Sequence, residues 1–363
     1  MRPLFLLLAL AFMAISVGVS RADGVGFRRL SLVEMPERPL EAAVWYPTSA
    51  SGPQTLIGDN AALVGESVIV DAAPTPGRHR LVVLSHGFGG NLGNQAWLAV
   101  TLARHGYVVA AVNHPGTTSR NLKPDTGARL WERPRDLSRL IDRITRDPAF
   151  GAAADKVGVI GHSLGGWTAM ALAGARFDPA RFAADCELHA QLAACEIAGR
   201  LEVGGTAEAR TLLAGDLADR RVGTAEARAL LAGDLADQRV GAAVALDLGL
   251  ARGFTPESLA ALKVPVLVMS AGEGDAQVPA ALESRYLAAH LPFALGRYTA
   301  LDGATHFSFL PLCKPGAVAL LEAEKHGDGP VCHKGTAAEG RAALHAQVAD
   351  AVLHFLDTEL GAP

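Results

Sequence analysis

The residues best suited to chemistry in this 363-residue chain form the run Gly161-His162-Ser163-Leu164-Gly165. An apolar stretch, residues 157–160, precedes the run, and an alanine-rich segment, residues 167–176, follows it. Gly-x-Ser-x-Gly between a strand and a helix is the layout of a nucleophile elbow, whose sharp turn presents the serine hydroxyl at the end of a sheet. Glycines on both sides let the neighbouring backbone approach that turn closely. We therefore predict that Ser163 is a nucleophile and not part of an ordinary Gly/Ser loop.

A serine hydroxyl needs a base within hydrogen-bond reach and an acid that orients the base. His306 follows the last strand-like segment, and we predict that it is the base. For the acid we predict Asp275, just after the penultimate strand-like segment, with Asp247 at the end of the segment before it as the alternative. Three other histidines are less well placed for this role: His86, His114 and His162. We expect the side chain of His162 to point away from the base.

The same chemistry requires donors for the negative charge that develops on the substrate carbonyl oxygen. One donor would be the backbone amide of Leu164, directly after the nucleophile. The loop His86-Gly87-Phe88-Gly89-Gly90 ends another apolar run, and its glycines allow amides to turn inward. We predict the amide of Phe88 as the second donor, with its ring forming a wall of the acyl pocket.

The segments that must position these residues alternate between strand-like and helix-like patterns. Residues 80–85, 107–113, 157–160, 239–246, 264–270 and 296–301 predict strands, and residues 80–85 form a continuous aliphatic run, as in a strand buried on both faces. Between two of them, residues 132–146 carry apolar side chains at helical spacing. This alternation predicts an α/β fold with a mostly parallel sheet and helices on both faces. Residues 49–76 are rich in small and turn-forming types and predict a surface excursion.

Residues 177–240 interrupt the alternation after the helix that follows the nucleophile, and they predict a helical insertion. They contain two 18-residue copies, residues 205–222 and 223–240, which differ only at Thr211 against Ala229 and Arg220 against Gln238. Two copies are too few for a solenoid. The insertion is either a lid over the active site or a neutral surface elaboration, and the second copy reads as dispensable.

The composition excludes some classes of partner. The formal net charge is −4 without basic clustering, so nucleic acid is not an expected ligand. Residues 1–22 have Arg2, an apolar run and a small-residue cleavage site, which predicts a signal peptide and a periplasmic or secreted protein. We expect residues 23–363 to form one domain without a stable membrane span once the signal is removed.

Export changes the interpretation of the four cysteines. An even number in an oxidising compartment indicates disulfides, and we favour the local pairing Cys186–Cys195 and Cys313–Cys332. No cysteine pair has the spacing of a zinc site. We expect no metal and no cofactor, because a serine, a base and an acid suffice for acyl transfer.

These residues together resemble the α/β-hydrolase superfamily: Gly161–Gly166, the His86–Gly90 loop, Asp275 and His306. More narrowly, three runs resemble bacterial exported dienelactone-hydrolase-like proteins related to platelet-activating-factor acetylhydrolases: Val44-Trp45-Tyr46-Pro47, Asn113-His114-Pro115-Gly116 and His306-Phe307-Ser308-Phe309-Leu310. The wider resemblance implies Asp275 as the acid, whereas the acetylhydrolases imply Asp247. Dienelactone hydrolases use a cysteine nucleophile, so that activity is not expected here.

The resemblance implies an exported serine esterase acting on a small-molecule ester or a lipid. Its alternatives are a phospholipid or platelet-activating-factor type of acyl hydrolase, a lipase or polyesterase, and a catalytically silent binding protein with the same fold.

Overall fold

The computed structural model describes residues 24–201, 224–272, 278–323, 329–332 and 338–362, so the predicted signal peptide lies outside the described residues. In this part of the chain a ten-stranded sheet has the order β12-β11-β10-β9-β5-β6-β2-β1-β4-β3. Its strands are Gly24–Leu32 (β1), Leu40–Thr48 (β2), Thr55–Ile57 (β3), Glu66–Val70 (β4), Leu81–Ser85 (β5), Val108–Val112 (β6), Val157–His162 (β9), Val240–Leu246 (β10), Val266–Ala271 (β11) and Gly296–Leu301 (β12). A small hairpin joins Thr117–Thr118 (β7) and Asn121–Leu122 (β8).

The six strands from β12 to β6 run parallel, while β2 pairs antiparallel with β6 and with β1. Every residue of β5, β6, β9, β10 and β11 is buried except Gly241, as expected for strands covered on both faces. The register places Leu246 beside both His162 and Met269. The carboxyl ends of β9, β10 and β11 therefore meet at one edge of the sheet.

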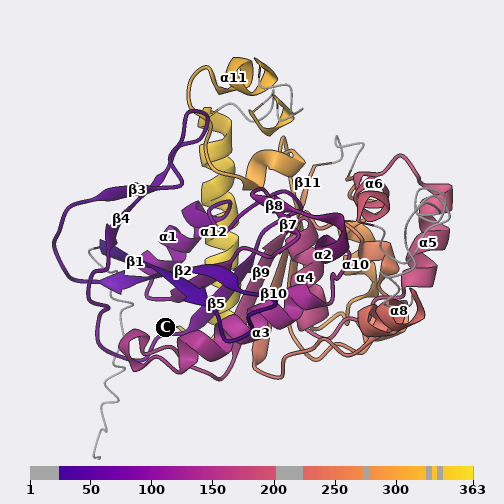
Figure 1. Cartoon of the computed structure of the whole chain (residues 1–363), viewed down its shortest axis with the longest axis horizontal. Coiled ribbons are helices and arrows are strands. Elements are labelled where there is room, and N and C mark those ends of the chain that lie inside the picture. Colours follow the sequence, from indigo (N-terminus) through magenta and orange to yellow (C-terminus); the bar gives the residue numbers. More distant parts are fainter. Residues whose placement is uncertain (1–23, 202–223, 273–277, 324–328, 333–337, 363) are drawn as a thin grey trace, which may run out of the picture.

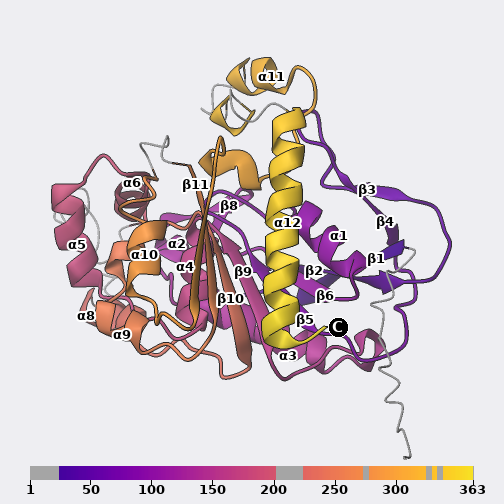
Figure 2. The same ribbon diagram turned by 180° about the vertical axis from the view of Figure 1, so that it is seen from behind.

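Helices cover both faces of this sheet (Figures 1 and 2). On one face lie α3 (Glu132–Thr145), α4 (Leu164–Leu172), α9 (Pro256–Ala260) and α10 (Ser284–His290), and on the other lie α1 (Ala96–Arg104) and α12 (Ala338–Leu360). The remaining helices and 3₁₀ turns are α2 (Pro124–Gly127), α5 (Pro179–Leu188), α6 (Ala193–Arg200), α8 (Thr224–Ala232), α11 (Ala317–Ala323), η1 (Pro148–Phe150), η2 (Ala251–Gly253), η3 (His306–Phe309) and η4 (Gly329–Cys332). Among the described helices, none combines the length and the apolar character that crossing a membrane requires.

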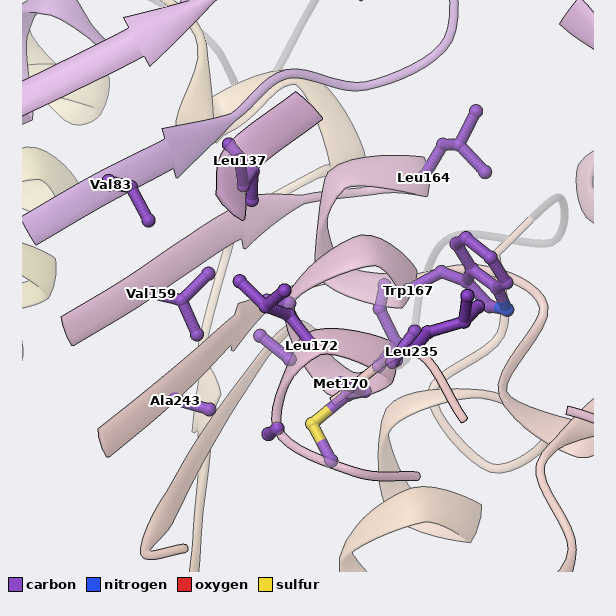
Figure 3. Packing of buried hydrophobic residues seen from close by; sticks show 14 of the residues in the cluster. Val83, Leu137, Val159, Leu164, Trp167, Met170, Leu172, Leu235 and Ala243 are labelled. Atoms are coloured by element: carbon purple, nitrogen blue, oxygen red, sulfur yellow. The ribbon is translucent and has the colours of Figure 1, made fainter. Parts of the chain in front are cut away.

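The core on the α3–α4 face fixes the helix that follows the nucleophile. Figure 3 shows Leu172 of α4 directed toward Val159 on the sheet, whereas Leu164 and Trp167 extend from the opposite side of the helix; all four residues belong to one buried cluster. All nine residues of α4 are buried, so the helix is locked between sheet and surrounding segments. Burying a large apolar side chain contributes roughly 1.5–3 kcal/mol.

Two segments differ from their sequence-based interpretation. Residues 49–76 are not a simple excursion, because β4 extends the sheet by pairing parallel with β1 and antiparallel with β3. The second copy of the repeat is not a free surface element either. Its Leu231 and Leu235 are buried in the core, and its Asp237 accepts a hydrogen bond from Ser138 of α3 at 2.7 Å. Local sequence could not reveal these contacts, since they join segments about 40 to 100 residues apart.

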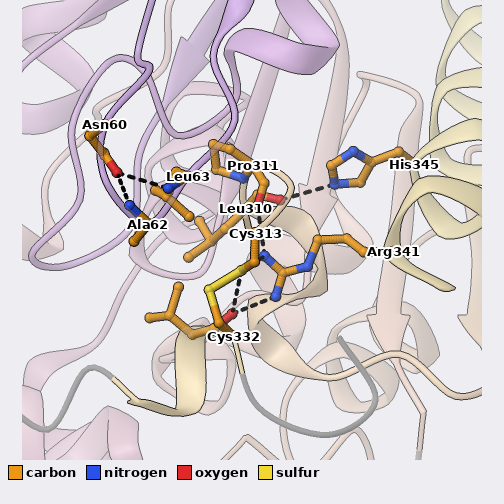
Figure 4. The surroundings of a disulfide bond; sticks show 10 residues. Asn60, Ala62, Leu63, Leu310, Pro311, Cys313, Cys332, Arg341 and His345 are labelled. Carbon is orange, nitrogen blue, oxygen red and sulfur yellow. Dashed lines mark hydrogen bonds between the residues drawn. A yellow bond between two sulfur atoms is a disulfide. The ribbon is translucent and has the colours of Figure 1, made fainter. Parts of the chain in front are cut away.

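The predicted cysteine pairing is confirmed. Cys186 bonds Cys195, linking α5 to α6, and Cys313 bonds Cys332 beside α11. Figure 4 shows the second disulfide beside Arg341 of α12, which donates hydrogen bonds to the carbonyl oxygens of Pro311 and Val331. The segment that follows the predicted base is thereby attached to α12.

Candidate active site

Ser163 occupies the turn between β9 and α4 in a strained conformation, with φ 57° and ψ −122°. The flanking glycines are sterically required. A Cβ at Gly161 would overlap the carbonyl oxygen of Gly165, and a Cβ at Gly165 would overlap that of Ser85. The geometry is that of a nucleophile elbow at the carboxyl edge of the parallel strands, where sites form in open α/β sheets.

The described acid next to His306 is Asp247, the alternative in our sequence-based prediction. The Nδ1 of His306 lies 2.6 Å from Oδ2 of Asp247, and the other carboxylate oxygen accepts the amide proton of Ala271 at 2.8 Å. The Asp247 side chain is 1% exposed and that of His306 is 12% exposed. Asp275, our first prediction for this role, lies outside the described residues.

This pair fixes the working tautomer of His306. A carboxylate oxygen can only accept a hydrogen bond, so Nδ1 carries the proton and Nε2 is the basic nitrogen. The pair also lies beside the elbow. The amide of Ser163 donates to the carbonyl of Leu246, directly before Asp247, at 3.0 Å. The ring of His162, directly before Ser163, lies 4.7 Å from the His306 ring, centroid to centroid.

The loop after β5 lies directly against the nucleophile. A Cβ added at Gly87 would stand 3.1 Å from Cβ of Ser163, so the bare backbone approaches the serine closely. Two backbone hydrogen bonds hold the loop. The amide of Gly89 donates to the carbonyl oxygen of Thr117 at 2.9 Å, and the amide of Gly90 donates to the carbonyl oxygen of Gly87 at 3.1 Å. Within the described part of the chain, the amides of Phe88 and Leu164 donate no hydrogen bond. Both predicted oxyanion donors are therefore available at the elbow.

A buried arginine joins the two segments that carry these amides. Arg133 of α3 is 1% exposed and donates to the carbonyl of His86 and the hydroxyl of Ser85 on one side, and to Thr168 of α4 at 2.9 Å on the other. Burial lowers its pKa to about 9. Because Arg133 contacts both the loop with Phe88 and the helix with Leu164, it sets their separation.

A hydrogen-bonded chain of polar side chains lies behind Arg133. Ser85 lies 3.0 Å from Nε2 of His114, whose Nδ1 lies 2.9 Å from Asp136, and Arg38 holds both oxygens of Asp136 at 2.7 and 2.6 Å. Burial, and next the Arg133 charge, hold the pKa of His114 well below its usual range. The imidazole is therefore neutral at neutral pH.

Sequence analysis missed this chain of polar residues and misjudged His162. The signal for Arg133 and Asp136 was present, because both lie one helical turn before predicted core positions, Leu137 and Leu140. The His162 ring does not point away from the base. It donates from Nε2 to the carbonyl oxygen of His306 at 2.9 Å. Burial, followed by the nearby His306, holds the pKa of His162 well below its usual range.

Among the described residues, one group of side chains comes close enough together to be considered as metal ligands, but its chemistry does not suit a metal ion. Asp185, Cys186 and Cys195 lie within 4.8 Å of one another, but the two sulfurs are bonded to each other. Disulfide sulfurs are not the thiolates that bind zinc. This group therefore offers one carboxylate and no thiolate.

Comparisons with known proteins agree with this architecture. A family model described as "Alpha/beta hydrolase family" matches residues 82–319. No curated protein matches the chain. A solved ferulic acid esterase from Streptomyces cinnamoneus is similar in structure, with a TM-score of 0.59 and 20% sequence identity over 94% of this chain and 92% of that one. That likeness establishes a common fold. Since the family model spans well over half of the sequence, this protein belongs to the alpha/beta hydrolase family.

Proposed function

We propose that the protein is an exported serine esterase that cleaves carboxylic esters through an acyl-enzyme. Ser163 is the nucleophile, His306 the base, and Asp247 the acid. The observation that carries the proposal is the 2.6 Å hydrogen bond between His306 and Asp247 at the strand edge that presents the Ser163 elbow. It gives the imidazole the tautomer that a serine nucleophile requires.

The reaction follows from the positions of these groups. Ser163 Oγ attacks the ester carbonyl carbon while Nε2 of His306 takes the hydroxyl proton, and the carbonyl electron pair moves onto oxygen. The amides of Phe88 and Leu164 donate to that oxyanion, which stabilises it by several kcal/mol in a preorganised site. The intermediate collapses as His306 returns the proton to the leaving alcohol. Water then attacks the acyl-enzyme by the same steps, releasing the carboxylic acid and restoring the serine.

Asp247 replaces Asp275 as our choice of acid. Asp247 ends β10, the strand next to the elbow strand, and its second oxygen is fixed by the Ala271 amide. A carboxylate held by two directed hydrogen bonds orients the imidazole and stabilises the imidazolium formed during attack. In the sequence, Asp247 directly follows β10 and Asp275 stands four residues after the end of β11.

The contacts of the insertion support the hypothesis of a lid over the active site more than that of a neutral surface elaboration. A Cβ at Gly249, two residues after Asp247, would lie 3.7 Å from Cβ of Ala194 on α6. The Cys186–Cys195 disulfide holds α6 against α5. We infer that α6 bounds the acyl pocket, so the hydrolysis rate should depend on acyl length. Equal rates across p-nitrophenyl esters from acetate to palmitate would argue against a wall at this place.

Export is supported by the predicted signal in residues 1–22 together with two disulfides. The mature protein should begin at Asp23 and should be recovered outside the cytoplasm. Its intact mass after fractionation, measured with and without reduction, tests both points. A full-length reduced chain in the cytoplasm would contradict them.

The decisive test of the proposed reaction is chemical labelling of Ser163. The wild type should be labelled by a fluorophosphonate, mapped by peptide mass spectrometry to the elbow, and should release p-nitrophenol from the ester panel. Ser163→Ala should lose both. Methyl ferulate and a short-chain phospholipid in the same panel separate the esterase from the lipid-acyl alternatives. A Ser163→Ala variant that kept full activity would refute the proposal.

A further inference from the structure

The turn that carries His306 is held by aromatic ring N–H groups. The Nε1 of Trp97 donates to the carbonyl oxygen of Phe309 at 3.0 Å, and Nε2 of His345 contacts those of Ser308 and Leu310 at 3.1 and 3.0 Å. Because carbonyl oxygens only accept, the His345 nitrogen must carry its proton. Burial lowers the pKa of His345 to about 4, so the ring is neutral at neutral pH and its single proton is on Nε2.

The two rings come from different helices and stack on each other. Trp97 of α1 and His345 of α12 are parallel to within 5°, with centroids 3.8 Å apart, and they are only 5% and 8% exposed. Each ring therefore limits the movement of the other. The two donors form a rigid pair that contacts three successive carbonyls of one short turn.

The turn is also held by the buried side chain of Phe309, by the His306–Asp247 bond and by the bond from Arg341 to the carbonyl of Pro311. Its own backbone bonds are short-range, from Ser308 to Thr305 and from Leu310 to Phe307. These bonds shape the turn without orienting it on the sheet. The turn is oriented on the sheet by hydrogen bonds from other elements. His162 donates to the carbonyl oxygen of His306, and the Trp97–His345 pair donates to the three carbonyl oxygens that follow. Figure 4 shows His345 reaching toward Leu310 from α12.

We propose that Trp97 and His345 are positioning residues of the hydrolytic reaction, which fix the His306 turn so that the imidazole meets both Asp247 and Ser163. The inference rests on the proposed function. The role proposed for the two residues is to aim the His306 side chain, which is 12% exposed, rather than to stabilise the fold. A misplacement of about 1 Å in a reacting group costs on the order of a hundredfold in rate.

The test removes the N–H donors and keeps an aromatic side chain at each position. In Trp97→Phe and His345→Phe, kcat on p-nitrophenyl acetate should fall about tenfold to a hundredfold, whereas KM should stay within about twofold. The rate of fluorophosphonate labelling should fall in parallel. His345→Gln restores a side-chain N–H near the same carbonyls and should recover part of kcat.

Matched controls exist elsewhere in the chain. Trp131 donates from Nε1 to Glu132 at 2.9 Å, and the largely buried His79 contacts two carbonyl oxygens, those of Gly106 and Thr75, each at 2.9 Å. Trp131→Phe and His79→Phe therefore make the same chemical changes at residues whose ring N–H groups bond to atoms outside the His306 turn. They should leave kcat near the wild-type value when assayed well below the melting temperature of every variant.

The outcomes separate the inference from the function on which it rests. Activity in Ser163→Ala would remove the proposed function itself. If Ser163→Ala is inactive but Trp97→Phe and His345→Phe lose no more kcat than their controls, the function stands and the inference is wrong. Trp97→Phe removes a single donor and keeps an aromatic side chain at the position, so it keeps the test valid if His345→Phe does not fold.

Discussion

The molecule contains two arrangements of serine, histidine and aspartate. At the strand edge, His306 is hydrogen-bonded to Asp247 beside the Ser163 elbow. Beneath the oxyanion loop, Ser85, His114 and Asp136 are linked in the same order by bonds of 3.0 and 2.9 Å, and all three residues are 0% exposed. In both, Nδ1 of the histidine faces a carboxylate.

The surroundings of the two arrangements differ. Arg133 donates to the hydroxyl of Ser85, and Arg38 occupies both oxygens of Asp136. Cations at both ends oppose the imidazolium that nucleophilic attack would create, and burial opposes it further. The Ser163 arrangement has a histidine whose side chain is 12% exposed. Among the described residues, no arginine binds its carboxylate, and the amides of Phe88 and Leu164 donate no hydrogen bond. Three residues in the right order are therefore insufficient for catalysis, because substrate access and the electrostatics of the proton transfer decide which set can work.

The largest expected effect comes from the acid of the exposed arrangement. Asp247→Asn should lower kcat/KM by about a thousandfold or more, because an amide can no longer fix the tautomer of His306. Its melting temperature should change little in comparison. Asp275→Asn, measured on the same ester panel, is the matched control and should lose less than about tenfold if Asp247 is the acid. The reverse ranking would return the role to Asp275.

The corresponding change in the buried arrangement should affect stability instead. Asp136→Asn leaves the Arg38 guanidinium buried without its carboxylate, which costs about 3–5 kcal/mol of unfolding free energy. Urea unfolding measures that loss. The kcat/KM per titrated active site should remain within about tenfold of the wild type, because the group does not touch the reacting atoms. A loss of activity as large as that of Asp247→Asn would make the two arrangements functionally equivalent.

The smallest of the three effects is a difference in pH dependence. Burial depresses the pKa of His114 in the folded state, so below the unfolded pKa of about 6.5 the unfolded chain binds more protons and folding becomes less favourable. This contribution is complete above pH 6.5 and is lost as the pH falls. His114→Gln should therefore make the decline in stability between pH 8 and pH 5 shallower, as measured by urea unfolding at each pH. An unchanged decline would mean that His114 is already protonated in the fold.

Much of the fold could be predicted from the sequence because the site-bearing strands are buried on both faces. Such strands are continuous apolar runs, and the predicted runs ending at Ser85 and Leu246 correspond to β5 and β10. The predicted strand ending at Leu301 is β12, which lies at the edge of the sheet and is partly exposed. The elbow could also be predicted from the sequence, because a side chain at Gly161 or Gly165 would overlap neighbouring backbone atoms and glycine is therefore needed at both positions. The short strands β3 and β4 were not predicted, because their sequences lack a periodic pattern of apolar residues.

The parts of the site that could not be predicted depend on contacts distant in sequence. Trp97 and Phe309 are 212 residues apart, and His162 and His306 are 144 apart. The local sequence around a histidine does not show whether its ring donates to a carbonyl oxygen or abstracts a proton. Only the assembled sheet edge distinguishes their roles, and it also brings Asp247 to the base.

The second copy of the duplicated segment supplies Leu231, Leu235 and Asp237 to the folded core. The first copy carries the same side chains at equivalent positions, Leu213, Leu217 and Asp219. The side chains that make these contacts are therefore encoded twice, and deletion of residues 205–222 would leave Leu231, Leu235 and Asp237 in the chain. The duplication thus allows the length of the insertion to change by 18 residues while the core-forming sequence is kept.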